Sequence, residues 1–479
     1  MRLSLETLDS LGLDVARPGY DFASQRAGIV HFGIGAFHRA HQAVYTDDAM
    51  AAGDANWRII GVSLRSADVA EQLNPQDGLY TLAQRSTDQV AARLIGSVAK
   101  VIVAPQDPDA VIDALASADT HIVSFTVTEK GYVRRPDGSL DWDNADVVSD
   151  RAGSAPPRTI YGFVAAGLAR RKSAGLPGLT LLSCDNLADN GARLRELMSE
   201  YLTATDPALA EWFARHCRCP GTMIDRIVPA TTDADRRWIA SLTGLADEGA
   251  VITEPFCQWV IEDDFAGLRP RWEAVGAQIV SDVGAYEAAK LRMLNGAHSA
   301  LAYLGLDRGH EFVHQAIGDP TLRRIIETLM RQEAAPTLSA DAGIDLPAYA
   351  DALIARFANA ALLHRLVQIA MDGSQKIPQR WLEPLAINQA AGRMAPATLL
   401  ALAAWIGHVQ GTKRPVDDPM AAQLAALWAK HGADGIVDAL FGRGGLLQSM
   451  WQPSAEETKL LQRQIVNGKP RGTIDFHAS

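Results

Sequence analysis

The pattern of apolar and polar residues divides the chain into two parts. Up to about residue 284, short apolar runs typical of buried strands alternate with helical patterns. The clearest of these runs are Ala27–Gly33, Trp57–Leu64, His121–Thr126 and Leu179–Ser183. From His310 onward, Ala- and Leu-rich amphipathic patterns dominate and no strand-rich unit appears. We therefore predict an α/β domain over residues 1–284 and a largely α-helical domain over residues 285–479.

The first apolar run ends in a glycine-rich turn, and a helical pattern follows over Phe37–Ala51. This order opens a dinucleotide-binding unit, because the backbone must approach the pyrophosphate closely and a helix N-terminus favours its charge. Gly33 and Gly35 match the first two glycines of Gly-x-Gly-x-x-Gly, whereas His38 stands at the third. We therefore expect a Rossmann-like domain. Its cofactor turn is predicted to contain Phe32, Gly33, Gly35, Ala36 and Phe37.

Two arginines are candidates for binding the cofactor. Arg39 falls in the first turn of the predicted helix, where it would pair with a phosphate or form a surface salt bridge. Arg65 follows the second apolar run, where an acidic residue would bind the adenosine ribose of NAD. Because an arginine suits a 2′-phosphate instead, the residues leave NADP open beside NAD.

Polar residues also follow the later apolar runs. Glu129 comes shortly after His121–Thr126, and Asn186 follows Leu179–Ser183. Ligands of α/β sheets bind outside the carboxyl ends of the strands, so both side chains are candidates for the site. Glu129 also fits a solvated loop acid.

The stretch Tyr286–Gly305 reads as one helix with a buried apolar face and three polar interruptions. At roughly 100° per residue, Asn295 lies about 140° and His298 about 80° from Lys290, so all three share one arc. The arc is either a solvated face or a proton-transfer site. A lysine among apolar residues has its charged form disfavoured, which allows it to act as a base near neutral pH.

The composition excludes several classes of protein. A net charge of −11 argues against non-specific nucleic-acid binding. The N-terminus carries acidic residues and no signal-peptide pattern, and the longest apolar stretch, Ala397–Gly407, is too short to span a bilayer. Four cysteines imply no disulfide framework, and Cys217 and Cys219 lack partners at zinc spacing. We expect a metal-free cytoplasmic protein. Without a heptad seam in the helical part, we expect a monomer.

Seven blocks, in order, resemble the polyol-specific long-chain dehydrogenases, the mannitol dehydrogenase family, over nearly the whole chain. The blocks are FGIGAFHRAHQAVYTDD, TVTEKGY, SCDNLADNG, TMIDRIVPATT, EPFCQWVIEDDF, KLRMLNGAHSALAYLG and DGSQKIPQR. The resemblance implies metal-independent hydride transfer between NAD and a secondary alcohol or ketone of a linear sugar derivative, either a polyol or a hexuronate.

The resemblance also implies roles for individual residues. Lys290 matches the general base, Asn186 and Asn295 the amide donors to the substrate oxygen, and His298 a residue that hydrogen-bonds the substrate. Glu129 matches a gate that passes the proton between the base and water. The positions expected to bind distal substrate groups are Asp225 and Lys376.

The substrate expected from the resemblance is D-fructuronate, with D-mannitol and D-fructose as the alternative. Gln368 stands where mannitol dehydrogenases tend to have arginine, and the DGSQKIPQR block with Arg380 is closer to the fructuronate-reducing branch. Read from its residues alone, the polar island Asp372–Arg380 is a plain turn, or a loop that presents Lys376 and Arg380 to an anionic or hydroxyl-rich substrate.

Overall fold

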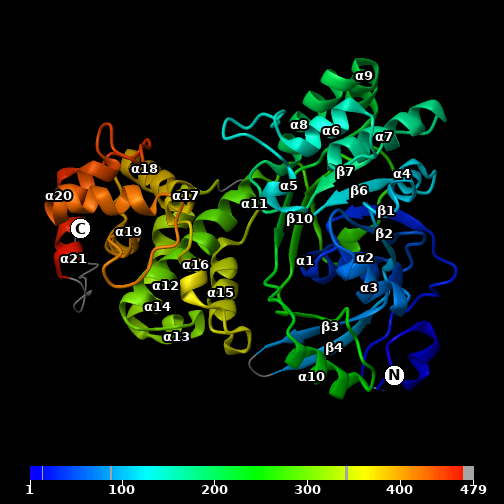
Figure 1. Cartoon of the computed structure of the whole chain (residues 1–479). Helices are drawn as coiled ribbons and strands as arrows, with labels where there is room; N and C mark the ends of the chain where they lie inside the picture. The colour runs from blue at the N-terminus through cyan, green and yellow to red at the C-terminus, as the bar shows by residue number, and fades with distance from the viewer. Residues whose placement is uncertain (13, 87–88, 340–342, 468–479) are drawn as a thin grey trace. The chain divides into compact units, whose positions relative to one another are not determined.

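The computed structural model describes residues 1–12, 14–86, 89–339 and 343–467. The chain forms two compact units, Met1–Gly284 and Ala285–Ser479. Figure 1 shows strands in the first unit and helices throughout the second. Each unit is described by itself below.

A five-stranded parallel sheet forms the centre of the first unit. Its strands run in the order β5-β2-β1-β6-β7. Their bounds are β1 (Ala27–Phe32), β2 (Arg58–Ser63), β5 (Val98–Val103), β6 (Ile122–Phe125) and β7 (Thr180–Ser183). The chain crosses from one side of β1 to the other between β5 and β6, so the strand order reverses between β1 and β6. Ligands of open α/β sheets bind at such a reversal.

Alternating residues of the strands pack against different layers. Val30, Val62 and Val123 belong to one core, which contains residues of α4, α7, α8 and α9. Ile29 and Ile59 face the other side, where α2 and the strand β10 cover them. The helices of this unit are α1 (Ala36–Ala40), α2 (Gln42–Ala51), α3 (Asp68–Leu73), α4 (Pro108–Ala116), α5 (Thr128–Gly131), α6 (Ala145–Ala152), α7 (Ile160–Ser173), α8 (Asn190–Thr205), α9 (Pro207–His216) and α10 (Asp233–Thr243). Both faces of the sheet are therefore buried, which explains its continuous apolar runs.

Two three-stranded sheets complete the first unit, in the orders β11-β10-β8 and β4-β3-β9. Their strands are β3 (Tyr80–Arg85), β4 (Val90–Ile95), β8 (Thr222–Asp225), β9 (Val251–Thr253), β10 (Gln258–Glu262) and β11 (Gln278–Val280).

The second unit is built around α12 (Gly296–Asp307) and α19 (Pro396–His408), both of which are almost fully buried. The other helices of this unit are α13 (Val313–Gly318), α14 (Pro320–Thr328), α15 (Leu346–Phe357), α16 (Leu366–Ile369), α17 (Gly373–Ile377), α18 (Glu383–Ala390), α20 (Ala421–Phe441) and α21 (Ala455–Asn467).

The α/β domain with a helical domain after it is confirmed, but two details of the prediction are wrong. The predicted helix Phe37–Ala51 is broken at His41, where φ is −125° and ψ is −95°. The predicted loop over Asp372–Arg380 is helical, because α17 continues directly into the π-helical turn η9 (Pro378–Leu382).

The stretch predicted as one helix over Tyr286–Gly305 is continuous but not uniform. α11 (Gly284–Ala289) runs into a π-helical turn, η4 (Lys290–Asn295), before α12 begins. A π turn closes its hydrogen bonds from i to i+5 and is wider than an α turn. The angular spacing calculated for a uniform helix therefore does not hold between Lys290 and Asn295.

Candidate active site

The predicted cofactor turn begins directly after β1 at Gly33, a position that only glycine can occupy. Gly33 has φ of +91°, and its N–H donates to the carbonyl of Val62 at 3.0 Å. A Cβ atom at Gly33 would lie 2.1 Å from the carbonyl oxygen of Thr126, which is far inside van der Waals contact. The fold itself therefore requires this glycine, because β1 and the end of β6 meet here.

Gly35 differs, because the protein leaves open space beside it. Its φ is −78°, and the nearest atom to an added Cβ would be the carbonyl oxygen of Gly33 at 3.9 Å. Ala36 begins α1, and Phe37 stacks on His41 with ring centroids 5.1 Å apart. Nothing in the part of the fold that the structure describes excludes a side chain at Gly35, so the packing does not require this glycine and the space beside it is open to a ligand.

Arg39 is buried, so the surface salt bridge considered for it is not found. Its guanidinium donates to the carbonyl oxygens of Gly249 at 2.5 Å and Gly35 at 3.4 Å. Burial lowers the pKa of Arg39. These contacts give Arg39 a structural role, because they tie α1 to the segment before β9.

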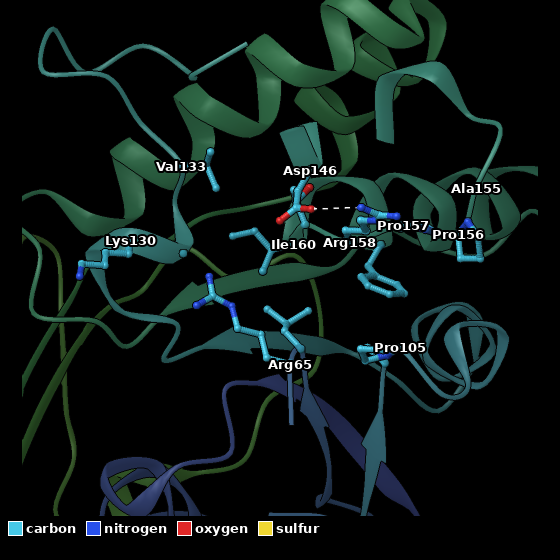
Figure 2. Close-up of a pocket in the computed structure, with 15 residues that line it drawn as sticks. Arg65, Pro105, Lys130, Val133, Asp146, Ala155, Pro156, Pro157, Arg158 and Ile160 are labelled. Atoms are coloured by element: carbon cyan, nitrogen blue, oxygen red, sulfur yellow. Dashed lines mark ion pairs between the residues drawn. The ribbon is translucent and has the colours of Figure 1, made fainter. Parts of the chain in front are cut away.

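A pocket of about 450 Å³ lies at the carboxyl ends of β2 and β5, within the first unit. Arg65 lines it together with Lys130 and the start of α7. Figure 2 shows Arg65 on the side of the sheet, opposite Asp146 and Arg158, which form an ion pair at 3.6 Å. This is the edge where α/β sheets bind the adenosine part of a dinucleotide. The pocket, the turn at Gly33 and the open space beside Gly35 together fit a dinucleotide cofactor.

Glu129 and Asn186 lie in two segments, after β6 and after β7, that are connected by hydrogen bonds. Glu129 lies in α5, directly after β6, and its side chain is 67% exposed. Asn186 follows β7 and is also exposed. The carboxylate of Asp185 accepts the backbone N–H groups of Val127 and Thr128, which links the residue before Asn186 to the turn of Glu129. Asp225, the third polar residue expected in this unit, is buried at the end of β8.

In the second unit, Lys290 and Asn295 begin and end η4, and His298 lies in the first turn of α12. The His298 ring packs between Phe357 and His364, with centroid distances of 5.4 and 4.8 Å. Burial, more than the neighbouring His364, lowers the pKa of His298 well below its usual value. The imidazole is therefore neutral near pH 7 and has one donor and one acceptor nitrogen.

Arg380 and Lys376 lie beside this helix. Arg380 Nη1 lies 2.7 Å from Ser299 Oγ and 3.4 Å from the carbonyl oxygen of Asn295. Lys376 Nζ donates to the carbonyl oxygen of Met371 at 2.6 Å. Burial lowers the pKa of Arg380 to about 10 and also lowers the pKa of Lys376. Two partly desolvated cations thus stand near His298, whose pKa both of them lower further.

No metal-binding cluster of three or more His, Cys, Asp or Glu side chains occurs within the described ranges. Cys217 and Cys219 are buried, and burial raises the pKa of these thiols to about 11 and about 12. At neutral pH they are therefore protonated thiols. None of the helices that the structure describes is long and apolar enough to cross a membrane.

Both units match models of one protein family. Residues 27–274 match the mannitol dehydrogenase Rossmann domain, and residues 282–450 match the mannitol dehydrogenase C-terminal domain. The chain belongs to the mannitol dehydrogenase family. The predicted resemblance is thereby confirmed, and the chain is an oxidoreductase with a Rossmann domain and a helical C-terminal domain.

Relatives within the mannitol dehydrogenase family include enzymes with different names. D-mannonate oxidoreductase of Escherichia coli is 40% identical over 92% of this chain and 93% of its own length. Mannitol 2-dehydrogenase of Phaeosphaeria nodorum is 39% identical over 89% of this chain and 77% of its own. The structure of Pseudomonas fluorescens mannitol 2-dehydrogenase, a ternary complex with NAD and D-mannitol, is 36% identical. The structural alignment covers 98% of this chain and 96% of the Pseudomonas fluorescens chain, with a TM-score of 0.82.

Some residues that define the candidate site were not predicted from the sequence. Asp185 and Tyr132 carry no signal beyond their places in the SCDN and TEKGY blocks, since Asp185 accepts backbone N–H groups and the Tyr132 hydroxyl from a segment more than 50 residues away. His364 packs against His298 from a segment without a recognisable motif. These contacts depend on how strands and helices pack, which local sequence does not reveal.

Proposed function

We propose that the protein interconverts D-fructuronate and D-mannonate with NAD(H), without a metal ion. Membership of the mannitol dehydrogenase family and the similarity to D-mannonate oxidoreductase support this proposal. The observation that carries the choice of substrate is the pair of partly buried cations, Arg380 and Lys376, next to the helix of Lys290. A hexuronate has a carboxylate and a linear polyol has none, so desolvated cations favour the acid.

In the proposed reaction, the nicotinamide cofactor supplies the hydride acceptor for oxidation and the donor for reduction. Lys290 takes the proton from the secondary alcohol as its carbon loses hydride, and returns it during reduction. Asn186 and Asn295 donate hydrogen bonds to the substrate oxygen and stabilise its developing negative charge. Glu129 passes the proton on to water. His298, neutral at pH 7, donates to or accepts from a substrate hydroxyl.

For the distal part of the substrate we propose three contacts. Arg380 binds the carboxylate in a charge-assisted, bidentate geometry. Lys376 and Asp225 bind the remaining hydroxyl groups. The lowered pKa of Arg380 fits this role, because a desolvated cation is stabilised by an incoming anion.

The proposed cofactor is NAD, the dinucleotide bound in the Pseudomonas fluorescens relative. Gly33, Gly35 and the segment between them would hold the pyrophosphate, and the pocket beside Arg65 would hold the adenosine part. The absence of an acidic residue among Ser63, Leu64, Arg65 and Ser66 leaves NADP as the alternative. The monomeric state expected from the sequence stays a prediction.

Mannitol 2-dehydrogenase is the second candidate, because the enzyme of that name from Pseudomonas fluorescens shares the fold over nearly the whole chain. It would use the same catalytic residues on a neutral substrate. Gln368, which lines a separate pocket of about 320 Å³ with His408 and Arg414, would then require another explanation.

A steady-state screen distinguishes the candidates. Rates are measured with NADH and with NADPH against fructuronate, tagaturonate and fructose, for the wild type and for Arg380→Gln. If Arg380 binds the carboxylate, kcat/KM for the uronate falls about 10- to 100-fold in the variant, as expected for loss of a hydrogen bond to a charged group. The value of kcat/KM for fructose changes less than threefold.

The control is Arg331→Gln, which removes an arginine paired with Asp351 in the same unit and leaves both values of kcat/KM unchanged. Equal losses on uronate and ketose would contradict carboxylate recognition, and a wild-type preference for fructose would favour the mannitol reading.

A further inference from the structure

A single buried carboxylate holds both ends of the turn that carries Glu129. Asp185 is 7% exposed, and its Oδ1 accepts the N–H of Thr128 at 2.8 Å. Its Oδ2 accepts the N–H of Val127 at 3.1 Å and the hydroxyl of Tyr132 at 3.0 Å. The three donors lie before, at the start of and after the single helical turn α5.

This turn has an unfavourable backbone conformation, so it needs an external anchor. Thr128 has φ of +63° and Val133 has φ of +46°. Both residues are β-branched, and such residues rarely adopt left-handed backbone. A lone helical turn is also marginal by itself. The Asp185 carboxylate and the fully buried Tyr132 supply the contacts that select this conformation.

The Glu129 side chain receives little direct support. Its Oε2 lies 3.9 Å from Arg134 Nη2, which is beyond hydrogen-bond distance. The backbone of α5 therefore sets where the side chain begins, and with it the region that the carboxylate can reach. Asp185 also directly precedes Asn186, so one residue connects the turn of the proposed proton gate to the proposed amide donor.

The electrostatic environment agrees with this geometry. Burial is the main effect and raises the pKa of Asp185. The hydrogen bonds from the N–H groups of Thr128 and Val127 act against it, and the negative charge of the nearby Glu129 adds to the increase. The two acids therefore lie close enough to interact, although only one of them is exposed.

We propose that Asp185 is a positioning residue: its carboxylate fixes the Val127–Tyr132 turn so that Glu129 is directed for proton exchange next to Asn186. This inference rests on the proposed roles of Glu129 and Asn186. Asp185 itself does not touch the reacting atoms in this account. It acts through the backbone N–H groups that it accepts.

The test substitutes Asp185→Asn, which keeps the size but replaces one acceptor oxygen by a donor. We expect kcat to fall about 100-fold, because a displacement of about 1 Å at a reacting group has an effect of that size. The dissociation constant for NADH, measured by fluorescence titration, should change less than twofold. Hydrogen–deuterium exchange should become faster in peptides covering residues 127–132 and stay unchanged in peptides covering β3.

Glu333→Gln is a matched control for the general loss of a buried carboxylate. Glu333 is buried in the π-helical turn η5 (Leu329–Ala334) and also accepts two consecutive backbone N–H groups and one hydroxyl, from Ala397 and Thr398. It should lower the melting temperature about as much as Asp185→Asn does, with kcat within twofold of the wild type. Tyr132→Phe removes one donor to Asp185 and replaces Asp185→Asn if that variant does not fold.

A double-mutant cycle with Glu129→Gln decides whether Asp185 acts through Glu129. The inference predicts that Asp185→Asn lowers kcat less than threefold in the Glu129→Gln background. The inference would be overturned if the losses in kcat of the two single variants multiply in the double variant. It would also be overturned if Asp185→Asn shows wild-type hydrogen–deuterium exchange in residues 127–132. A wild-type kcat for Glu129→Gln alone would instead remove the proposed gate and the inference with it. If no sugar derivative is turned over at all, the proposed function fails, while the exchange experiment still decides whether Asp185 anchors the turn.

Discussion

Replacing the two glycines of the cofactor turn by alanine separates the needs of the fold from the needs of the ligand. At Gly33, the added Cβ would lie 2.1 Å from the carbonyl oxygen of Thr126. Ordinary contact needs about 3.4 Å, so β1 and β6 would have to separate by about 1.3 Å at this point. At Gly35, the added Cβ would meet nothing closer than 3.9 Å, and φ is −78°. The two substitutions are chemically identical, but the structure predicts opposite effects on stability.

The magnitudes follow from these distances. Gly33→Ala places a side chain at φ +91°, which costs roughly 1–3 kcal/mol before the steric overlap is relieved. We therefore expect a loss of at least about 2 kcal/mol and a melting temperature lower by about 4–8 °C for a domain of this size. Gly35→Ala should stabilise the fold by about 0.4–1 kcal/mol, because alanine reduces the conformational entropy of the unfolded chain.

Thermal unfolding without cofactor and fluorescence titration with NADH measure the two effects. Gly35→Ala should melt at or above the wild-type temperature and yet bind NADH at least about 10-fold more weakly, because the methyl group occupies the space that the pyrophosphate would approach. Wild-type affinity in Gly35→Ala would refute the assignment of this turn to the cofactor. An unchanged melting temperature in Gly33→Ala would refute the steric argument.

The other predictions concern the catalytic groups, metal dependence and pH. Lys290→Ala should bind NADH within about twofold of the wild type and lose about 10²- to 10⁴-fold in kcat, as expected for a general base; wild-type turnover would exclude that role. Asn186→Ala and Asn295→Ala should each lower kcat about 10²-fold if they stabilise the substrate oxygen, and effects below threefold would assign the oxyanion contacts elsewhere. EDTA should leave kcat unchanged, and inhibition that zinc reverses would contradict the metal-free mechanism. Burial lowers the pKa of His31 to about 3, so the free energy of unfolding should fall as the pH drops below about 6.5, where the unfolded histidine takes up a proton and the folded one does not. At pH 5 this one group accounts for about 2 kcal/mol. Melting temperatures that stay constant from pH 7.5 to 5 would show that His31 is not buried as described.

The sequence predicts the parts of the fold that depend on local patterns. The strands β1, β2, β6 and β7 are continuous apolar runs because both faces of the sheet are covered, so each run marks a strand directly. The break at His41 and the π turn at Lys290 are different, because neither changes the spacing of apolar residues enough to be seen. They arise from packing within each unit.

The candidate site shows the same division. Gly33 and Arg65 were found because a strand end and a glycine turn are visible in the sequence. The burial of Arg39 was missed, because an arginine in a first helical turn reads as a surface residue until its carbonyl partner, 210 positions away in Gly249, is known. Asp185 was missed for the same reason, since it binds a turn 57 residues earlier. Motifs reveal groups that act on ligands, whereas groups that act on the backbone emerge only in three dimensions.

The π turn at Lys290–Asn295 makes the length of this segment as important as its composition. An α-helix advances about 100° per residue, and a π turn holds one residue more in each hydrogen-bonded ring. Deleting one residue inside the turn would leave Lys290 and His298 chemically unchanged, but it would remove the extra residue that makes the turn wide, so the segment between them would close as an α-helix. Substitutions within the turn and single-residue deletions are therefore different kinds of change. The first alters a side chain, and the second alters the geometry of the turn that joins two halves of one helix.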